Sequence, residues 1–212
     1  MPAIFNEKTK WALRARLLEI GWEHLLRKGF RALRIEDITQ EAGIGKGTFY
    51  GFFVSKDEFV AEMVAENRRA LREEVDELCE RTGGRLGRGE LTRWMREVWH
   101  SERLLFRCIG VEDYRRIRRA LPADAQLGSE VGSGLVGGIL GDAAPRDAAS
   151  DPALAMTLQR IIAMALMSRD DFDPDALERA VDVLIDVTVD VLFGTRPGTP
   201  GPGTGAATPR QT

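Results

Sequence analysis

The segment Ile35–Phe59 restricts the fold of this chain more than any other feature of the sequence. It predicts two short helices, over residues 35–42 and 46–53, joined by a turn that contains Gly43 and Gly45. Two helices of about two turns joined through a glycine form a helix-turn-helix. The apolar residues expected to face its small core are Ile38, Ala42, Ile44 and Phe49.

That arrangement leaves polar and small residues on the outside of the second helix, namely Lys46, Gly47, Thr48 and Tyr50. Hydrogen-bond donors and small residues at a helix N-terminus suit a surface that enters a groove and binds phosphates. The alternative is a solvated helical corner without a partner, and three glycines around an exposed tyrosine argue against it. The charge distribution also favours a polyanionic partner, because residues 1–56 carry ten lysines and arginines against six acids, whereas the whole chain has a net charge of −3.

Helical periodicity continues along the chain and predicts an all-α protein. A glycine stop at Lys28-Gly29 ends the first helix. Ser55 begins a long helix with a capping box, in which its hydroxyl accepts a hydrogen bond from the Glu58 amide while the Glu58 carboxylate reaches back. The further helices are expected over about residues 91–100, 111–121, 152–168 and 174–193.

The last two helices are the most apolar of the chain, and each begins with an aspartate N-cap followed by proline, at Asp151-Pro152 and Asp173-Pro174. Polarity in the final helix is confined to one stripe, formed by Asp182, Asp186 and Asp190. A helix that is apolar on so much of its circumference must bury two sides, one of them against a second surface. A second copy of the chain is the simplest candidate, so we expect a homodimer through residues 152–168 and 174–193.

Cysteine usage and hydropathy exclude several classes of protein. Cys79 and Cys108 are too few for a disulfide framework or a four-thiolate metal site, and reduced structural thiols are expected. The chain does not open with a basic region followed by an apolar one, and the charge-free stretch 131–141 is far shorter than the roughly 20 residues of a membrane helix. We therefore expect a cytoplasmic protein without a membrane segment. Residues 194–212, rich in glycine, proline and threonine, are expected to be disordered.

Five groups of residues between positions 8 and 64 follow the pattern of a known family: Gly29-Phe30, Asp37-Ile38, Ala42-Gly43-Ile44, Lys46-Gly47-Thr48-Phe49-Tyr50 and Phe53-x-Ser55-Lys56. Through them the chain resembles the TetR family of bacterial transcriptional regulators. The resemblance implies a DNA-binding helix-turn-helix domain over residues 1–55 and an effector-binding and dimerisation domain over residues 56–193. The implied function is sequence-specific transcriptional regulation by a homodimeric repressor, which a small-molecule effector releases from a palindromic double-stranded DNA operator.

The resemblance also implies which residues meet DNA, namely Arg34, Gly45, Lys46, Gly47, Thr48, Tyr50, Gly51 and Lys56. Some residues depart from the family pattern. Arg34 stands where a threonine usually caps its helix, Gly45 replaces a common serine, and Gly51 has no side chain for base readout. In the first helix Gly21 replaces a common alanine, at an expected cost of up to ~1 kcal/mol.

Two tryptophans of the expected helix near residues 91–100 allow two interpretations. They belong either to the plain core of the C-terminal domain or to the lining of an effector pocket, since such pockets are mostly apolar and aromatic. The candidate lining residues are Trp94, Val98, Trp99, Phe106, Tyr114 and Met164, and the expected effector is a small apolar molecule. The alternative function is a helical dimer whose C-terminal domain binds a protein partner or a small ligand without a transcriptional effector response.

Other short motifs resemble enzyme or cofactor sites but lack the context that such sites require. Gly132–Gly137 spells G-x-G-x-x-G, which binds dinucleotides only between a strand and a helix of a βαβ unit. His24 and His100 have no ligands at suitable spacing on one helix face, and Glu97, three residues before His100, favours a surface hydrogen bond. No serine lies in a nucleophile elbow. We therefore expect no enzyme activity, no cofactor and no metal.

Overall fold

The computed structural model describes residues 7–120 and 150–194 and confirms the expected all-α fold. Gly132–Gly137 and residues 195–212 of the expected tail lie outside the described residues. In chain order the helices are α1 (Glu7–Ala32), α2 (Ile35–Ala42), α3 (Lys46–Tyr50), α4 (Lys56–Arg81), α5 (Arg88–His100), α6 (Leu105–Cys108), α7 (Val111–Ala120), α8 (Pro152–Met167) and α9 (Pro174–Leu192).

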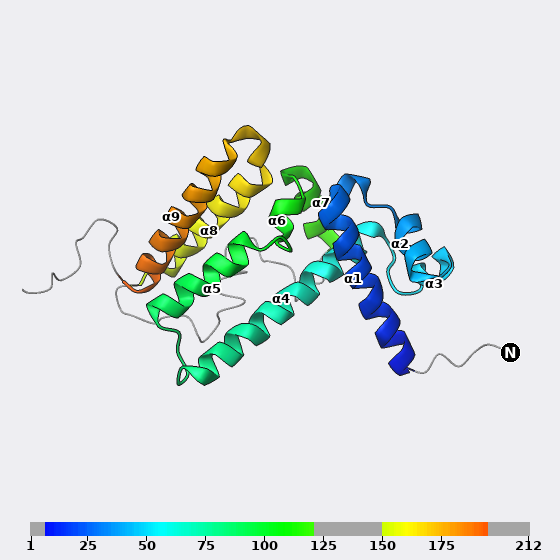
Figure 1. The fold of residues 1–212 in the computed structure, drawn as a ribbon, viewed down its shortest axis with the longest axis horizontal. Coiled ribbons are helices and arrows are strands. Elements are labelled where there is room, and N and C mark those ends of the chain that lie inside the picture. The colour runs from blue at the N-terminus through cyan, green and yellow to red at the C-terminus, as the bar shows by residue number, and fades with distance from the viewer. Residues whose placement is uncertain (1–6, 121–149, 195–212) are drawn as a thin grey trace, which may run out of the picture.

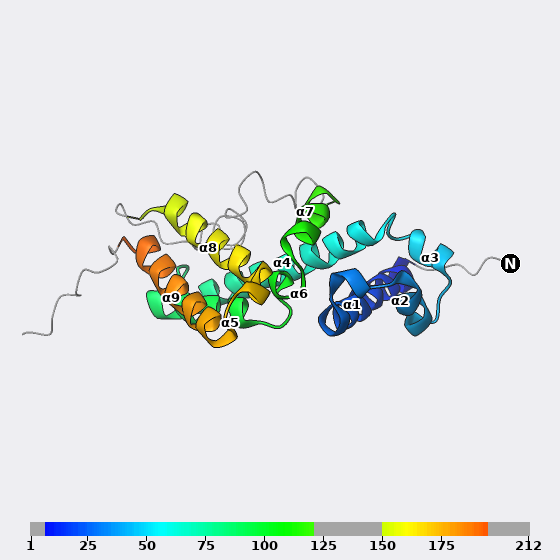
Figure 2. The ribbon, with the colours of Figure 1, turned by 90° about the horizontal axis from the view of Figure 1, so that it is seen from above.

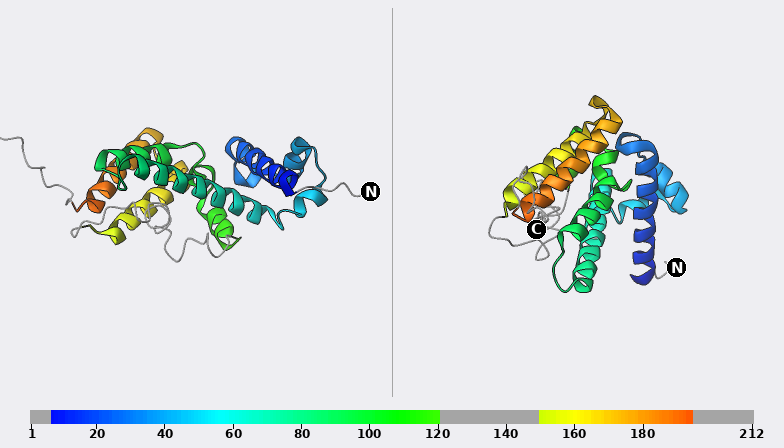
Figure 3. Two further views of the ribbon diagram at one scale, coloured as in Figure 1. Left: turned by 90° about the horizontal axis from the view of Figure 1, so that it is seen from below. Right: turned by 60° about the vertical axis from the view of Figure 1, so that its left-hand side comes forward.

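The helices form two groups that the long helix α4 connects (Figure 1). We call residues 7–63 the head; it consists of α1, α2, α3 and the first two turns of α4, and Figure 2 shows it at one end of the molecule. We call the other described residues the body. Helices α5, α8 and α9 lie at the opposite end, and the short helices α6 and α7 lie between the two groups (Figures 2 and 3).

The starts of three helices follow the signals in the sequence. The Ser55 hydroxyl accepts a hydrogen bond from the Glu58 amide at 3.1 Å, and the Glu58 carboxylate accepts one from the Val54 amide at 2.6 Å. Asp151 and Asp173 accept hydrogen bonds from the amides three residues further on, at 3.0 and 2.8 Å. The capping box and both aspartate N-caps are therefore confirmed.

The prediction of a helix over residues 46–53 is wrong at its C-terminal end, because α3 ends at Tyr50. The amides of Phe52 and Phe53 both donate to the carbonyl of Phe49, at 2.9 and 3.0 Å, so the chain tightens into a turn after the helix. This turn places the Phe53 ring in the core, with its centroid 5.2 Å from that of Phe49. Burial of an aromatic side chain thus ends α3 earlier than the local pattern indicates.

Gly21 lies at a close approach of α1 to α4, so its role differs from the tolerable replacement expected from the sequence. A Cβ atom at this position would lie 2.5 Å from Cζ of Phe59 and 2.8 Å from Sδ of Met63. Both neighbours are completely buried in the core of the head. The absence of a side chain at Gly21 therefore allows the two longest helices to pack together.

A row of ion pairs joins α5 to α9. Arg88 pairs with Asp190, and Arg96 donates to both carboxylate oxygens of Asp186, at 2.8 and 2.9 Å. The aspartate stripe of the last helix therefore faces a basic stripe on α5. Behind it, apolar side chains of α5, α8 and α9 form the core of the body.

His100 extends this row at the end of α5. Its Nε2 lies 3.1 Å from Asp182 and its Nδ1 lies 2.9 Å from Glu178, both on α9. These contacts replace the surface hydrogen bond to Glu97 that the sequence favours, because the imidazole lies over α9 instead of along its own helix. Arg107 of α6 binds Glu178 as well, with nitrogen–oxygen distances of 2.6 and 2.9 Å.

Candidate functional site

The exposed face of α3 is held in place by one buried ring. Phe49 is fully buried, and its ring packs against that of Phe59 with 5.1 Å between centroids. The turn before α3 is closed by Gly43, whose φ of 70° lies in the left-handed region, and by a hydrogen bond of 3.0 Å from the Ile44 amide to Thr39. With Phe49 anchored inward, the exposed residues of the segment are Gly45, Lys46, Gly47, Thr48, Tyr50 and Gly51.

Lys46 and Tyr50 project functional groups from this face. The Lys46 ammonium pairs with the Glu36 carboxylate of α2, and this contact lowers the pKa of Glu36. Tyr50 is about half exposed, with 51% of its surface accessible, and its ring forms a T-shaped contact with that of Phe49, with 5.5 Å between centroids. The face therefore presents an ammonium group and a phenol hydroxyl from one turn of helix.

The glycines of this face leave room for a partner. A Cβ atom at Gly45 or Gly47 would meet no other atom within 4 Å, so the backbone of α3 is open to close approach from outside. A Cβ at Gly51 would lie 3.2 Å from the carbonyl oxygen of Thr48, so this glycine also relieves crowding where the helix ends. Arg34 is exposed at the N-cap of α2 and makes no capping hydrogen bond, as expected for an arginine.

Lys56 has a structural role that the sequence did not reveal. Its ammonium donates hydrogen bonds to the carbonyl oxygens of Phe30 and Leu33, at 2.8 and 3.1 Å. It also lies 4.3 Å from the centroid of the Phe30 ring. Desolvation by burial lowers the pKa of Lys56. The side chain thus fastens the end of α1 to the start of α4, at the edge of the head.

The candidate pocket residues of the body separate into two groups. Trp94, Val98, Trp99 and Tyr114 are buried and Phe106 is partly buried. Rings of three of them form a continuous aromatic run: Trp99 and Phe106 stack with 6.0 Å between centroids, and Phe106 meets Tyr114 at 5.6 Å. Met164 lies on the outer face of α8 with 48% of its surface exposed, so the structure does not bring it together with the others.

Gln159 is a buried polar residue of the body that sequence reasoning missed. Its side chain is 3% exposed, and neither amide atom has a hydrogen-bond partner. It precedes Ile162 and Leu166 by three and seven positions, which places it on the core-facing side of α8. A glutamine on the apolar face of the most apolar stretch of the chain was the signal that could have identified it.

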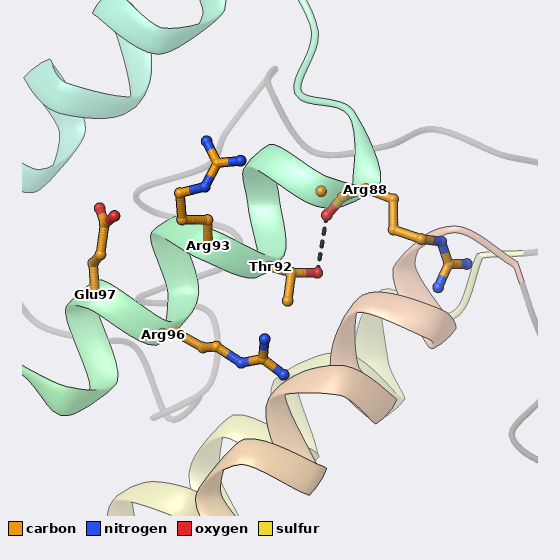
Figure 4. A pocket seen from close by; sticks show the side chains of 6 residues that line it. Arg88, Thr92, Arg93, Arg96 and Glu97 are labelled. Atoms are coloured by element: carbon orange, nitrogen blue, oxygen red, sulfur yellow. Dashed lines mark hydrogen bonds between the residues drawn. The ribbon is translucent and has the colours of Figure 1, made fainter.

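A cavity of about 550 Å³ opens on the outer side of α5 (Figure 4). Its lining residues are Arg88, Gly89, Thr92, Arg93, Arg96 and Glu97. Two of the three arginines already pair with aspartates of α9, and the Thr92 hydroxyl donates to the Arg88 carbonyl at 2.9 Å. The cavity is therefore an open groove beside the ion-pair row, and its charged groups are exposed to solvent.

Metal sites and membrane-spanning helices are both absent from residues 7–120 and 150–194. Within them, no three His, Cys, Asp or Glu side chains are grouped as metal ligands. No helix in these ranges combines the length and hydropathy that a membrane crossing requires.

Comparisons with known proteins agree on the head. Residues 17–63 match the family described as "Bacterial regulatory proteins, tetR family". The HTH-type transcriptional repressor NemR of Escherichia coli K12 is 29% identical over 75 residues, as is NemR of Escherichia coli O6:H1. The aligned part is 35% of this chain and 38% of either relative, so the similarity spans well under half of the length of each.

A solved structure resembles the chain over a longer range. It is a protein from Mesorhizobium loti assigned to the TetR-family transcriptional regulators, and it matches with a TM-score of 0.50. The superposition covers 85% of this chain and 96% of that one, at 19% sequence identity. At this level of identity the likeness concerns the fold.

Proposed function

Because the chain belongs to the TetR family of bacterial regulatory proteins, we propose that it is a homodimeric repressor that binds operator DNA through α3 and leaves it when a small molecule binds in the body. The observation that carries this proposal is the exposed face of α3, with Lys46 and Tyr50 presented outward over the buried Phe49. An α-helix of this kind fits the major groove, where side chains reach the base edges. No catalytic step is part of the proposed function.

We assign different roles to the residues of this face. Lys46, Thr48 and Tyr50 contact base edges or the DNA backbone in the major groove. Gly45, Gly47 and Gly51 let the helix backbone approach the DNA closely. Arg34 and Lys56 contact phosphates on either side. We also propose that residues 1–55 form the DNA-binding domain and residues 56–193 the regulatory and dimerisation domain.

The proposed dimer forms through α8 and α9. Four large apolar side chains on these helices are exposed in the single chain: Leu154, Ile161, Met164 and Val183. Contact with the same helices of a second copy would bury them in a four-helix arrangement. A two-fold dimer also presents two copies of α3 to DNA, as a palindromic operator with half-sites about one helical turn apart requires.

The test begins with selection of binding sites from random double-stranded DNA, followed by titration of the recovered sequence by fluorescence anisotropy. Lys46→Ala and Tyr50→Ala should each weaken operator binding by roughly 5- to 150-fold, because a base-edge contact contributes about 1–3 kcal/mol. Arg93→Ala, which removes an exposed basic side chain from α5, is the matched control and should leave affinity within about twofold. The proposal fails if no sequence is enriched, or if the two α3 variants bind as tightly as the control.

A further inference from the structure

Four side chains of the body bury polar atoms that lack a hydrogen-bond partner. These atoms are Nε1 of Trp94, Nε1 of Trp99, the hydroxyl of Tyr114 and both amide atoms of Gln159. Native proteins leave few such atoms unsatisfied, because each one loses its hydration on burial and gains nothing in exchange. Four such side chains in the body are therefore a feature that requires an explanation.

Two of the unsatisfied atoms, those of Trp99 and Tyr114, belong to one aromatic run. Trp99 and Tyr114 are joined through Phe106, whose ring packs against the cores of both the head and the body. Trp94 of α5 lies in the core of the body, and Gln159 is buried on α8. The run Trp99–Phe106–Tyr114 thus brings flat apolar surfaces and two of the unpartnered polar atoms together, and the charge of Arg160, next to Gln159 on α8, acts on the Tyr114 hydroxyl.

The charges around Tyr114 are positive. Burial raises the pKa of its hydroxyl, and the positive charges of Arg118 on its own helix, Arg68 of α4 and Arg160 of α8 act in the opposite direction. Arg68 is itself partly buried, and desolvation lowers its pKa. A negatively charged or electron-rich group near this hydroxyl would be stabilised, and a cation would be repelled.

We infer that the small molecule of the proposed regulatory function is a planar aromatic compound with acceptor oxygens, neutral or anionic, and that Trp99, Tyr114 and Gln159 bind it. The two indole N–H groups donate only, and the tyrosine hydroxyl and the glutamine amide donate as well as accept. A ligand with acceptor oxygens therefore satisfies every donor among them, and the Gln159 carbonyl oxygen needs a donor such as a ligand hydroxyl or a water molecule. A hydrocarbon satisfies none. This inference narrows the chemical class of the small apolar effector expected from the sequence, and it rests on the proposed function.

The first test needs no ligand. If the Gln159 amide has no partner in the empty protein, Gln159→Met removes the unsatisfied atoms at nearly constant volume and should raise the thermal midpoint by about 2–8 °C. Tyr114→Phe should act in the same direction. Gln40→Met, at an exposed position of α2, is the matched control and should leave the midpoint unchanged. A lower midpoint for both body variants would show that these groups are already bonded, for instance to buried water, and would overturn the inference.

The second test uses matched probes of opposite charge: benzoate and 2-naphthoate against benzamidine and 2-naphthamidine. The carboxylates should raise the thermal midpoint of the wild type and quench its tryptophan emission, and the amidines should do neither. Trp99→Phe, Tyr114→Phe and Gln159→Met should each weaken carboxylate binding by about tenfold or more. Failure of both carboxylates to bind at millimolar concentration, or equal binding of the amidines, would overturn the inference.

A third measurement separates this inference from the proposed function. The same probes are added to the complex with the selected DNA. Binding of 2-naphthoate without release of DNA supports the ligand class and contradicts the effector response. Release of DNA by the amidines alone supports the effector response and contradicts the ligand class.

Discussion

Replacement of Gly21 by alanine should destabilise the protein, although alanine is the common residue of the family at this position. The new Cβ would lie 2.5 and 2.7 Å from two ring atoms of Phe59 and 2.8 Å from the sulfur of Met63. Carbon atoms in contact ordinarily lie about 3.5–4.0 Å apart, so the neighbours must move. The Phe59 ring has little freedom to do so, because the Phe53 ring packs against it with 4.8 Å between centroids.

Two opposing effects determine the size of the loss. Alanine is better than glycine inside a helix by about 1 kcal/mol. Forcing extra volume into a packed core costs typically about 1–3 kcal/mol, and the upper part of this range applies because Phe59 and Met63 are completely buried. The net expectation for Gly21→Ala is a loss of about 2 kcal/mol in the free energy of unfolding. For a chain of this length that corresponds to a fall of about 4–8 °C in the thermal midpoint.

The assay is urea and thermal denaturation followed by circular dichroism, with Gly89→Ala as the matched control. A Cβ at Gly89 would meet no atom within 4 Å, and the residue lies in the first turn of α5, so this variant should keep or slightly raise stability. An unchanged or raised midpoint for Gly21→Ala would refute the reasoning. It would show that α1 and α4 separate at this point at little cost.

Four further changes test other contacts. Glu36→Gln should strengthen DNA binding by roughly two- to fivefold in anisotropy titrations at low salt, since it frees Lys46 and removes a nearby negative charge; unchanged affinity would contradict a role of Lys46 at DNA. Met164→Arg should yield a folded monomer by analytical ultracentrifugation, and a dimer of wild-type strength would exclude this part of α8 from the interface. Arg107 and His100 lower the pKa of Glu178, so its stabilising contribution is complete above its ordinary pKa of 4.5 and disappears as the pH falls through the lowered value. Glu178→Gln should therefore be less stable at pH 7 and should lose less stability between pH 5 and 3, and parallel pH curves for both proteins would contradict this. Lys56→Ala should weaken binding to operator and other DNA alike and make the salt slope shallower by about one, and an unchanged slope would remove Lys56 from the phosphate contacts.

The helix boundaries of the head were predictable because their determinants are local. The Ser55 capping box acts within four residues, and Gly43 closes the turn through bonds to its immediate neighbours. The expected stop at Gly29 appears as a kink, because Gly29 has a non-helical φ of 72°, and a short helical stretch continues beyond it to Ala32. The end of α3 was the exception. There the burial of Phe53 against rings elsewhere in the head decides where the helix stops, and a local pattern does not contain that contact.

The partners of charged residues in the body were not predictable in the same way. The four-residue spacing of Asp182, Asp186 and Asp190 was visible, but it does not say which helix the stripe faces. Arg96 and Asp186 are 90 positions apart, and only the packing of α5 on α9 brings them together. Arg96 and His100 are also four positions apart, which matches the spacing of the aspartates. This match indicates the pairing of the two helices only when both sequences are compared together.

The candidate pocket shows the same limit for apolar patterns. Helical spacing correctly placed Trp94, Val98 and Trp99 on the inner face of their helix. It could not separate α8 residues that face the core from those that face outward, because apolar side chains occur on both sides of this helix. For this reason the sequence did not identify Gln159 as a buried residue, and it placed Met164, which is exposed, among the pocket residues.

Lys56 is the residue at which the resemblance and the structure assign different roles, and the two roles are compatible. An ammonium group has three N–H donors, and two of them bind the carbonyls of Phe30 and Leu33. The third N–H group can donate a hydrogen bond to one phosphate oxygen. A phosphate contact made in this way would also fix the end of α1 against α4, because the same group holds both helices. The orientation of the head on DNA would then depend on the α1–α4 junction, and a change at Gly21 or Lys56 would alter DNA binding even without touching a base.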